Sequence, residues 1–335
     1  MMDSVFMVGE QRSGSNLLRL ILNESGEIAG PHPPHILQRF MPLLDLFGDL
    51  NDEQNFTRLI DSVCKLVELN PVPWEGVILD RDDIRRRCRE NSLTAVFGAV
   101  MDAYAEARNA RGWICKSMQN IRWAEQLDNY FPNPKYVYLH RDPRDVTLSF
   151  MKAVIGDKHP YFIAQQWAEL QRLCLAERDR IGPAHFFRLG YEELTSTPRE
   201  IVEQLCEFLD IQFKEDMLAF HNSSEAKNAA GSSTLWQNVV QPIMATNSRK
   251  FVKEMSEDDI RIIESVAGDV MDELGYERLH VKPGEEIQFD EATIEQFRQE
   301  NDALLKEATN RTDPEDLRRR QQQAKVIDEI RSMAS

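Results

Sequence analysis

The segment VFMVGEQRSGSNL at residues 5–17 consists of an apolar run, a small polar loop with Gly9 and Gly14, and an apolar helix start. A strand, a loop and a helix in this order gather backbone N–H groups at a helix N-terminus, which predicts a phosphate-binding loop. The loop nearly matches the nucleotide-binding pattern G-x-x-x-x-G-K-[ST], but Ser15 stands where that pattern has lysine. The cation lies inside the loop, as Arg12. This displacement argues against ordinary ATP chemistry and favours a different anionic ligand.

Outside this segment, short apolar runs alternate with long segments of helical pattern. Strands are predicted at residues 4–8, 112–116, 135–140 and 185–190. Because the connections between them are long and helical, the strands are expected to run parallel. The predicted fold class is therefore α/β, with a parallel central sheet flanked by helices. Three of the flanking helices are predicted at residues 161–180, 197–210 and 256–274.

The chain divides by composition into a main domain and a tail. Residues 1–280 are expected to form the α/β domain. Within it, the proline-rich residues 30–95 are interpreted as a loop and helical excursion over the sheet edge. Residues 285–335 are rich in Glu, Gln, Arg and Asp, which predicts a charged helical C-terminal extension. We expect this extension to be solvated or to form a homo-oligomer contact, and we assign it no chemistry.

Composition also excludes several classes of function. The formal net charge of −16 argues against nucleic-acid binding, so an anion site must be a local basic focus. No run of about 18 apolar residues occurs, so no membrane span is expected. The first strand begins almost at Met1, which leaves no room for a signal peptide, and the cysteines have no C-x-x-C spacing. These features predict a cytoplasmic protein with reduced thiols and without a bound metal.

The loop GEQRSGSNL at residues 9–17 resembles the phosphosulfate-binding loop of sulfotransferases. These enzymes use 3′-phosphoadenosine-5′-phosphosulfate (PAPS) as donor, and their loop carries Lys or Arg, then Ser-Gly-Thr/Ser-Thr. Asn16 departs from the usual Thr or Ser, but its amide can still donate a hydrogen bond. The resemblance implies a P-loop-containing, sulfotransferase-like fold. The loop residues that it implies for donor binding are Gln11, Arg12, Ser13, Gly14, Ser15 and Asn16.

A second segment, YVYLHRDPRDVTLS at residues 136–149, resembles the family's 3′-phosphate segment. There an arginine ends a strand and a serine lies eight residues further on, as do Arg141 and Ser149 here. A guanidinium fork and a hydroxyl donor suit a phosphate group. Arg144 is a third cation in the segment, or else it pairs with a neighbouring aspartate. The alternative of a salt-bridged turn is less favoured, because the first loop lies upstream.

Three looser matches follow in the family's order. Lys116 resembles the strand lysine that reaches the transferred sulfuryl group. Tyr191 follows the last predicted strand and resembles the tyrosine near the adenine. The segment SSTLW at residues 232–236, followed by Arg249 and Lys250, resembles the late segment that closes over the donor.

The resemblance implies an in-line transfer of a sulfuryl group from PAPS to an acceptor hydroxyl or amine, without a metal. Charge grows on the oxygen bridging to the 5′-phosphate, and Arg12, or else Lys116, is expected to meet it. The small-molecule branch of the family has a base histidine two residues after the strand lysine, but Met118 stands there. We therefore predict His32 or His35 as the base, since histidine titrates near neutral pH.

The acceptor stays open at this point. The excursion at residues 30–95 is interpreted as its cover, and the acceptor as a small molecule, a carbohydrate or a peptide. Four large side chains of the excursion either line an apolar pocket or belong to the core: Phe40, Phe47, Phe56 and Trp74.

Two other functions are weighed against sulfuryl transfer. A P-loop kinase or nucleotide hydrolase would need lysine at position 15 and an aspartate for Mg²⁺. A non-catalytic nucleotide-binding module of the same fold would not need the cations of both motifs. Because Ser15 replaces the lysine and both motifs keep their cations, sulfuryl transfer is favoured.

Overall fold

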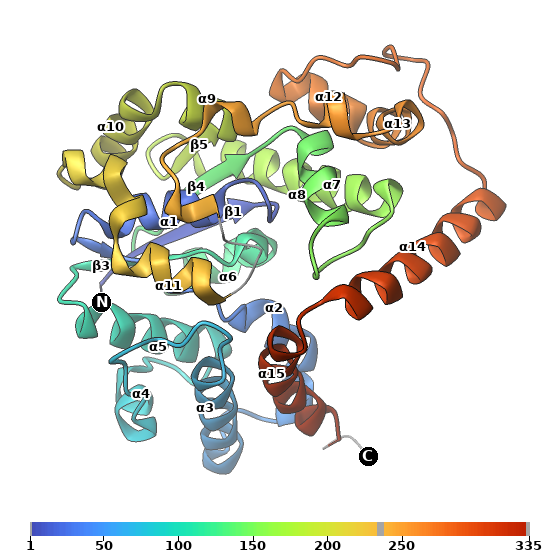
Figure 1. Cartoon of the computed structure of the whole chain (residues 1–335). Helices are drawn as coiled ribbons and strands as arrows, with labels where there is room; N and C mark the ends of the chain where they lie inside the picture. The colour runs from blue at the N-terminus through green and yellow to red at the C-terminus, as the bar shows by residue number, and fades with distance from the viewer. Residues whose placement is uncertain (1, 233–237, 333–335) are drawn as a thin grey trace.

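The computed structural model describes residues 2–232 and 238–332. Within these residues, a five-stranded sheet with all strands parallel forms the centre, in the order β2-β3-β1-β4-β5 (Figure 1). The strands are β1 (Asp3–Gly9), β2 (Ile28–Ala29), β3 (Gly112–Cys115), β4 (Lys135–His140) and β5 (Phe186–Gly190). The predicted α/β class and all four predicted strands are confirmed. The two-residue β2 was not predicted, because so short a run has no period to detect.

Strand β1 lies in the middle of the sheet and decides where the site forms. Val5 pairs with Ile114 of β3, and Phe6 pairs with Tyr136 of β4. Because the strands are parallel, the loops that follow β1, β3 and β4 leave the same edge of the sheet. Residues that are far apart in the sequence therefore meet at this edge.

Alternate side chains of β1 supply two separate cores. Phe6 and Val8 pack with α5 (Leu93–Ala107), α6 (Ala124–Tyr130), α8 (Pro160–Ile181) and α13 (Glu257–Leu274). Val5 and Met7 pack on the other face with α1 (Ser15–Asn23) and α10 (Pro198–Leu209). The three predicted flanking helices correspond to α8, α10 and α13, so these predictions are confirmed.

The remaining elements are short or peripheral. Between β3 and β5 they are η2 (Met118–Trp123) and α7 (Pro143–Met151). Those after β5 are α9 (Tyr191–Ser196), η3 (Glu215–Asn222), α11 (Ser224–Ser232), η5 (Ala245–Asn247) and α12 (Phe251–Glu254). No helix of residues 2–232 or 238–332 combines the length and the apolar character needed to span a bilayer.

The excursion forms a helical layer below the sheet in Figure 1. Its elements are α2 (Ile36–Phe40), η1 (Met41–Phe47), α3 (Glu53–Glu68) and α4 (Arg81–Arg87). The four large side chains for which two readings were open belong to the hydrophobic core: Phe40, Phe47, Phe56 and Trp74.

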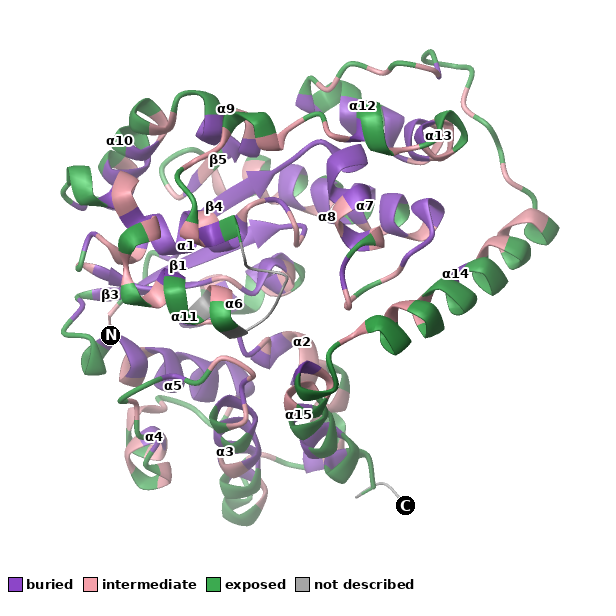
Figure 2. Cartoon of the chain, in the orientation of Figure 1, coloured by how far each residue is buried: buried purple, intermediate pink, exposed green. Residues whose placement is uncertain are grey.

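The C-terminal residues form two long helices, α14 (Glu291–Arg311) and α15 (Pro314–Ser332). Figure 2 shows α14 largely exposed, whereas parts of α15 are buried against the rest of the chain. Val326, Ile327 and Ile330 join the core that includes α3. The expectation of a solvated tail is therefore wrong for α15, because its few apolar residues fall on one face and find a partner within the same chain.

A buried carboxylate joins α13 to α7 beneath the site. Glu264 is fully buried and pairs with Arg144 at 2.7 Å, and Arg144 also pairs with Asp142 at 2.7 Å. Glu264 also accepts backbone N–H groups from Leu279 at 2.8 Å and Val281 at 3.0 Å. Arg144 is thus used within the fold, which confirms the reading that it pairs with a neighbouring aspartate.

We expect Glu264→Ala to lower the free energy of unfolding by about 3–5 kcal/mol, because it leaves the Arg144 guanidinium buried without one of its carboxylates. Urea unfolding followed by circular dichroism measures this change. Asp269→Ala is the matched control on α13, since Asp269 pairs with Arg172 at the exposed surface and such pairs contribute little. Equal effects of the two variants would contradict the structural role of Glu264.

Candidate anion site

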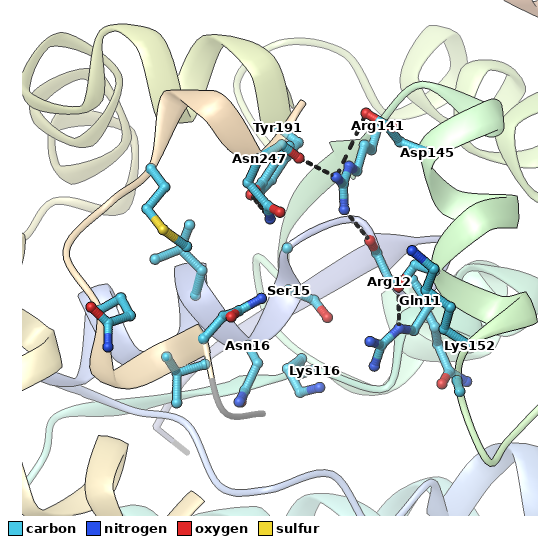
Figure 3. Close-up of a pocket in the computed structure, with 18 of the residues that line it drawn as sticks. Gln11, Arg12, Ser15, Asn16, Lys116, Arg141, Asp145, Lys152, Tyr191 and Asn247 are labelled. Atoms are coloured by element: carbon cyan, nitrogen blue, oxygen red, sulfur yellow. Dashed lines mark hydrogen bonds and ion pairs between the residues drawn. The ribbon is translucent and has the colours of Figure 1, made fainter. Parts of the chain in front are cut away.

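The loops after β1, β3 and β4 open into one cavity of about 520 Å³ (Figure 3). Most of the residues predicted for the site line it, from six separate parts of the chain. They are Gln11, Arg12, Gly14, Ser15, Asn16, His32, His35, Lys116, Arg141, Ser149, Tyr191 and Lys250. Ser13 and Arg249 are not among the lining residues. Ser13 is fully buried beneath the loop, and Arg249 is exposed outside it.

The loop keeps its shape through a close contact at Gly14. Gly14 has φ of 92°, in the left-handed region that favours glycine. A Cβ atom at this position would lie 2.4 Å from the Tyr191 ring. The ring therefore packs directly on the loop backbone, and no larger residue fits at position 14.

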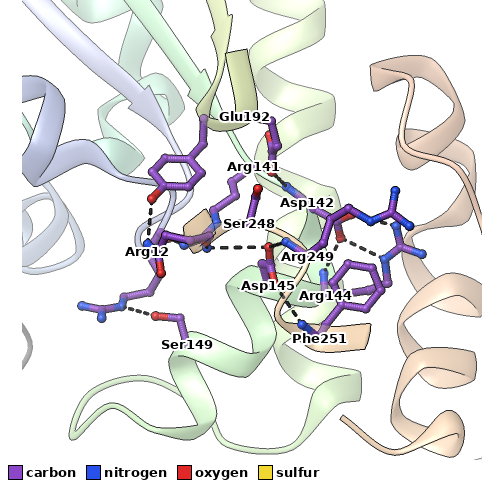
Figure 4. Close-up of polar contacts among 12 residues, drawn as sticks. Arg12, Arg141, Asp142, Arg144, Asp145, Ser149, Glu192, Ser248, Arg249 and Phe251 are labelled. Atoms are coloured by element: carbon purple, nitrogen blue, oxygen red, sulfur yellow. Dashed lines mark hydrogen bonds and ion pairs between the residues drawn. The ribbon is translucent and has the colours of Figure 1, made fainter. Parts of the chain in front are cut away.

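Arg12 connects the two predicted phosphate motifs. Its Nε donates to Ser149 Oγ at 2.9 Å, and its backbone carbonyl accepts from Arg141 Nη1 at 3.1 Å (Figure 4). Burial, and to a lesser extent the positive charges of Arg141 and Arg320, lower the pKa of Arg12 to about 10. Arg12 remains charged at neutral pH, in surroundings that favour a negative partner.

Arg141 is held over the loop by several groups at once. Its guanidinium lies over the Tyr191 ring at 4.3 Å and donates to the Asn247 carbonyl at 2.5 Å. Asp145 lies 3.7 Å from the same guanidinium. The Nε atom of Arg141 is buried and has no hydrogen-bond partner within the described residues. One donor of this arginine is therefore unused by the protein.

Asp145 anchors the late segment of the chain to α7. Its carboxylate accepts the backbone N–H groups of Arg249 at 2.6 Å and Phe251 at 3.1 Å. Asn247 and Lys250, which flank this contact in the sequence, line the cavity. The earlier part of the predicted closing segment, residues 233–236, lies outside the described residues.

Asn16 presents its amide N–H₂ group to the cavity. Arg19 Nε donates to Asn16 Oδ1 at 2.9 Å, which fixes the orientation of the amide. Within the described residues, Asn16 Nδ2 has no partner although it is buried. Figure 3 shows Asn16 and Lys116 from different strand ends beside the same space. Asn16 can therefore donate to an anion, as its chemistry predicts.

Lys116 follows β3 and is partly buried beside the loop. Burial, and to a lesser extent the positive charges of Arg19 and Arg12, lower the pKa of its ammonium group to about 7. Lys116 is thus poised between its charged and neutral forms near neutral pH, and a bound anion would favour the charged form.

His32 is held in one tautomer by Asn70. Val72 N–H donates to Asn70 Oδ1 at 3.3 Å and Asn70 Nδ2 donates to the His32 carbonyl at 3.2 Å, so Oδ1 faces the imidazole. His32 Nδ1 lies 3.0 Å from this oxygen and must be the donor. The lone pair of the neutral ring is then on Nε2. Burial lowers the pKa of His32 well below its usual value.

His35 precedes α2 and has φ of 56°, in the left-handed region. Its Nδ1 atom is buried without a partner within the described residues. Burial lowers the pKa of His35 to about 3. Met118, which replaces the family's usual base, is buried and does not line the cavity.

The structure adds lining residues that sequence reasoning missed. Lys152 lies one turn after Ser149, and this helical spacing could have indicated it. No sequence signal pointed to Arg320, which comes from α15. Further lining residues that were not predicted include Asp145, Phe220, Val239, Ile243, Met244 and Asn247.

The charged side chains that line the cavity are mainly positive, although the chain as a whole is acidic. Asp145 is the one carboxylate among the described residues that line it. The lining cations are Arg12, Lys116, Arg141, Lys152, Lys250 and Arg320. Nor do the described residues contain a group of three or more His, Cys, Asp or Glu side chains able to hold a metal ion. The arrangement can bind a multiply charged anion and place a neutral histidine beside it.

Comparisons of the sequence with known proteins agree on one family. The sequence profile of the sulfotransferase family matches residues 4–215. A putative protein-tyrosine sulfotransferase of Caenorhabditis briggsae is 24% identical over 83% of this chain and 91% of its own length. The omega-hydroxy-beta-dihydromenaquinone-9 sulfotransferase of Mycobacterium bovis is 23% identical over 83% of this chain and 76% of its own length.

Other matches are less informative about chemistry. An uncharacterized protein of Aquifex aeolicus is 22% identical, and the match spans 68% of this chain and only 28% of that protein. Among solved structures, the sulfotransferase domain from the Synechococcus PCC 7002 olefin synthase superposes with a TM-score of 0.56 at 19% identity. That match covers 79% of this chain and 94% of the domain, and it shows a shared fold.

Lysine NMR titration tests the electrostatics of the cavity. We expect two lysines to titrate unusually low, Lys116 near pH 7 and Lys158 near pH 8, because burial lowers the pKa of both. The variant Lys116→Met should remove the lower of the two signals. A titration in which all lysines keep pKa values above about 9 would contradict the burial of Lys116.

Proposed function

The chain belongs to the sulfotransferase family, and we propose that it transfers a sulfuryl group from PAPS to a hydroxyl or amine of an acceptor. The observation that carries this proposal is the pair of contacts at Arg12. They join the loop matched to the 5′-phosphosulfate with Arg141 and Ser149, which are matched to the 3′-phosphate. One ligand carrying both groups would span them.

The unpartnered donors around the loop fit such a ligand. In this proposal, the backbone N–H groups of residues 13–16, the Ser15 hydroxyl and Asn16 Nδ2 cradle the 5′-phosphosulfate. Arg141 Nε and the Ser149 hydroxyl receive the 3′-phosphate.

Other predicted donor-binding residues take supporting positions. In this proposal, Tyr191 lies near the adenine of the donor, and Gln11 and Lys250, which also line the cavity, contact the donor. Ser13 contributes its backbone N–H, since its hydroxyl is buried away from the cavity. Arg249 belongs to the closing segment through its backbone contact with Asp145.

The transfer is an in-line displacement at sulfur. A bond forms between the acceptor oxygen or nitrogen and sulfur, while the bond from sulfur to the bridging oxygen of the 5′-phosphate breaks. Arg12 and Lys116 stabilise the charge that develops on that bridging oxygen. The products are the sulfated acceptor and adenosine 3′,5′-bisphosphate (PAP). No step uses a metal.

His32 or His35 takes the proton that leaves the acceptor. The pKa values of both are lowered by burial, so both are neutral at pH 7 and able to accept a proton. The tautomer set by Asn70 places the lone pair of His32 on Nε2. The acceptor is a small molecule, a carbohydrate or a peptide; the relatives named above are sulfotransferases for protein tyrosine and for a hydroxylated menaquinone.

Nucleotide binding tests the role of Arg141. We expect Ser149→Ala to weaken binding of PAP by about 10- to 100-fold and to leave adenosine 5′-monophosphate nearly unchanged. Arg141→Ala should weaken binding of both nucleotides, and of PAP about 10- to 100-fold more, because Arg141 also holds the loop through the Arg12 carbonyl. Isothermal titration calorimetry measures both affinities, with Arg172→Ala as an exposed-arginine control. An equal loss for the two nucleotides would mean that these residues do not contact the 3′-phosphate.

Transfer of ³⁵S-labelled sulfate from PAPS tests the catalytic residues. Arg12→Ala should lower the rate by about 10²–10³-fold, and loss of the base histidine by about 10²–10⁴-fold. His185→Ala is the control, because His185 lies outside the cavity. If His32→Ala and His35→Ala both keep full activity, the assignment of the base is wrong.

The same experiments separate the rival functions. If wild-type protein fails to bind PAP or PAPS, sulfuryl transfer is wrong. Stabilisation by ATP with Mg²⁺ would instead favour a kinase or hydrolase. Tight PAP binding without turnover of any acceptor would favour a non-catalytic binding module.

A further inference from the structure

The cavity contains a cation from a part of the chain that lies outside the family match. Arg320 belongs to α15, about one hundred residues after the end of the matched segment 4–215. It pairs with Asp316 side-on, through Nε at 2.9 Å and Nη2 at 3.3 Å. This geometry leaves Nη1 unused by Asp316.

Arg320 lines the same cavity as the two candidate histidines. Its charge contributes to the lowered pKa of Arg12 in the loop and to that of Arg39 in α2. Helix α2 begins directly after His35. Arg320 thus lines the same cavity as the loop and lies within electrostatic range both of Arg12 and of the helix that follows the candidate bases. An acceptor has to lie in this region.

Helix α15 holds Arg320 in place through packing in the turns that follow it, since residues three and seven positions further on share its face of the helix. Gln323 Nε2 donates to the Leu66 carbonyl of α3 at 2.8 Å. Val326 and Ile327 are buried in the same contact region. In Figure 1, α15 stands beside α2 and α3 at the lower edge of the molecule. Since its anchor is buried, the helix presents Arg320 without a further folding step.

Helix α14 shapes a second wall of the same region. Asn301 Oδ1 accepts the backbone N–H groups of Lys158 at 2.8 Å and His159 at 3.0 Å. These contacts fix the loop between α7 and α8, and this loop and the end of α7 supply Lys152 and Ile155 to the cavity. Figure 1 shows α14 running past this loop toward α15. The C-terminal helices therefore support two parts of the cavity wall.

We propose that the C-terminal helices complete the acceptor site and that the acceptor carries a carboxylate or phosphate group close to the atom that is sulfated. This inference rests on the proposed sulfuryl transfer. Lys152 pairs with Glu254 at the surface. Arg320 belongs to neither of the motifs matched to the donor, so its remaining donor is available to a second anionic ligand. A guanidinium beside the reacting group is suited to a carboxylate or a phosphate, and Nη1 of Arg320 supplies the contact.

Matched sets of hydroxyl compounds test the acceptor class. Each set holds a carboxylate, a phosphate monoester and a neutral amide on the same phenyl, alkyl or sugar frame. Saturation-transfer NMR measures their binding to the protein with and without PAP. In at least one set, the anionic members should bind about 10- to 100-fold more tightly than the amide. Comparison of the carboxylate with the phosphate identifies which of the two is preferred.

Variants of α15 assign the effect to Arg320. Arg320→Gln should remove the preference for the anionic member while leaving binding of the amide and of PAP unchanged, and Arg320→Lys should restore part of it. Arg318→Gln is the matched control, because Arg318 is 68% exposed and pairs with Glu315. Circular dichroism confirms that the helix is intact in each variant.

The outcomes distinguish this inference from the proposed function. If PAP binds but no set shows an anionic preference, or Arg320→Gln behaves as Arg318→Gln does, the acceptor inference is wrong. If PAP fails to bind wild-type protein, the sulfuryl-transfer proposal is wrong. Suppose that, in the absence of PAP, wild-type protein prefers the anionic compounds and Arg320→Gln does not. An anion then binds beside Arg320 whether or not PAP binds.

Discussion

The hydrogen bond from the Arg141 guanidinium to the Arg12 carbonyl joins the two strand ends on which the site is built. It exists because β1 and β4 are parallel neighbours, so that the loops after them leave the same edge. The same guanidinium lies over Tyr191, whose ring packs on Gly14. The position of the Arg141 side chain therefore determines both the shape of the loop and one wall of the cavity.

The charge around this contact is opposite in sign to the net charge of the chain. The sequence has a formal net charge of −16, yet Asp145 is the one carboxylate among the described residues of the cavity wall. Burial lowers the pKa values of Arg12 and Lys116, and the neighbouring cations lower them further, so the charged forms of both groups are disfavoured in the cavity. An anionic ligand would stabilise these charged forms.

The parts of the structure that the sequence predicted share a physical basis. The strands were predictable because each is a short apolar run between long segments, and the loop because its glycines and polar residues follow one of them directly. Other features have no local signal. The two residues of β2 are too few to show a period, and the aromatic residues of the excursion gave no indication of whether they face a pocket or the core. Both are decided by which elements pack against them.

The sequence by itself determined the fold class, and it located the glycine-containing loop after β1 and the second cationic motif, since each depends on residues adjacent along the chain. It also supplied the candidate histidines. Only the tertiary structure decided that Arg12 meets Ser149, that Asn70 sets the tautomer of His32, and that Arg320 reaches the same cavity. These contacts join residues separated by tens to hundreds of positions, and no local pattern encodes which distant segments the packing of a parallel sheet and its covering helices brings together.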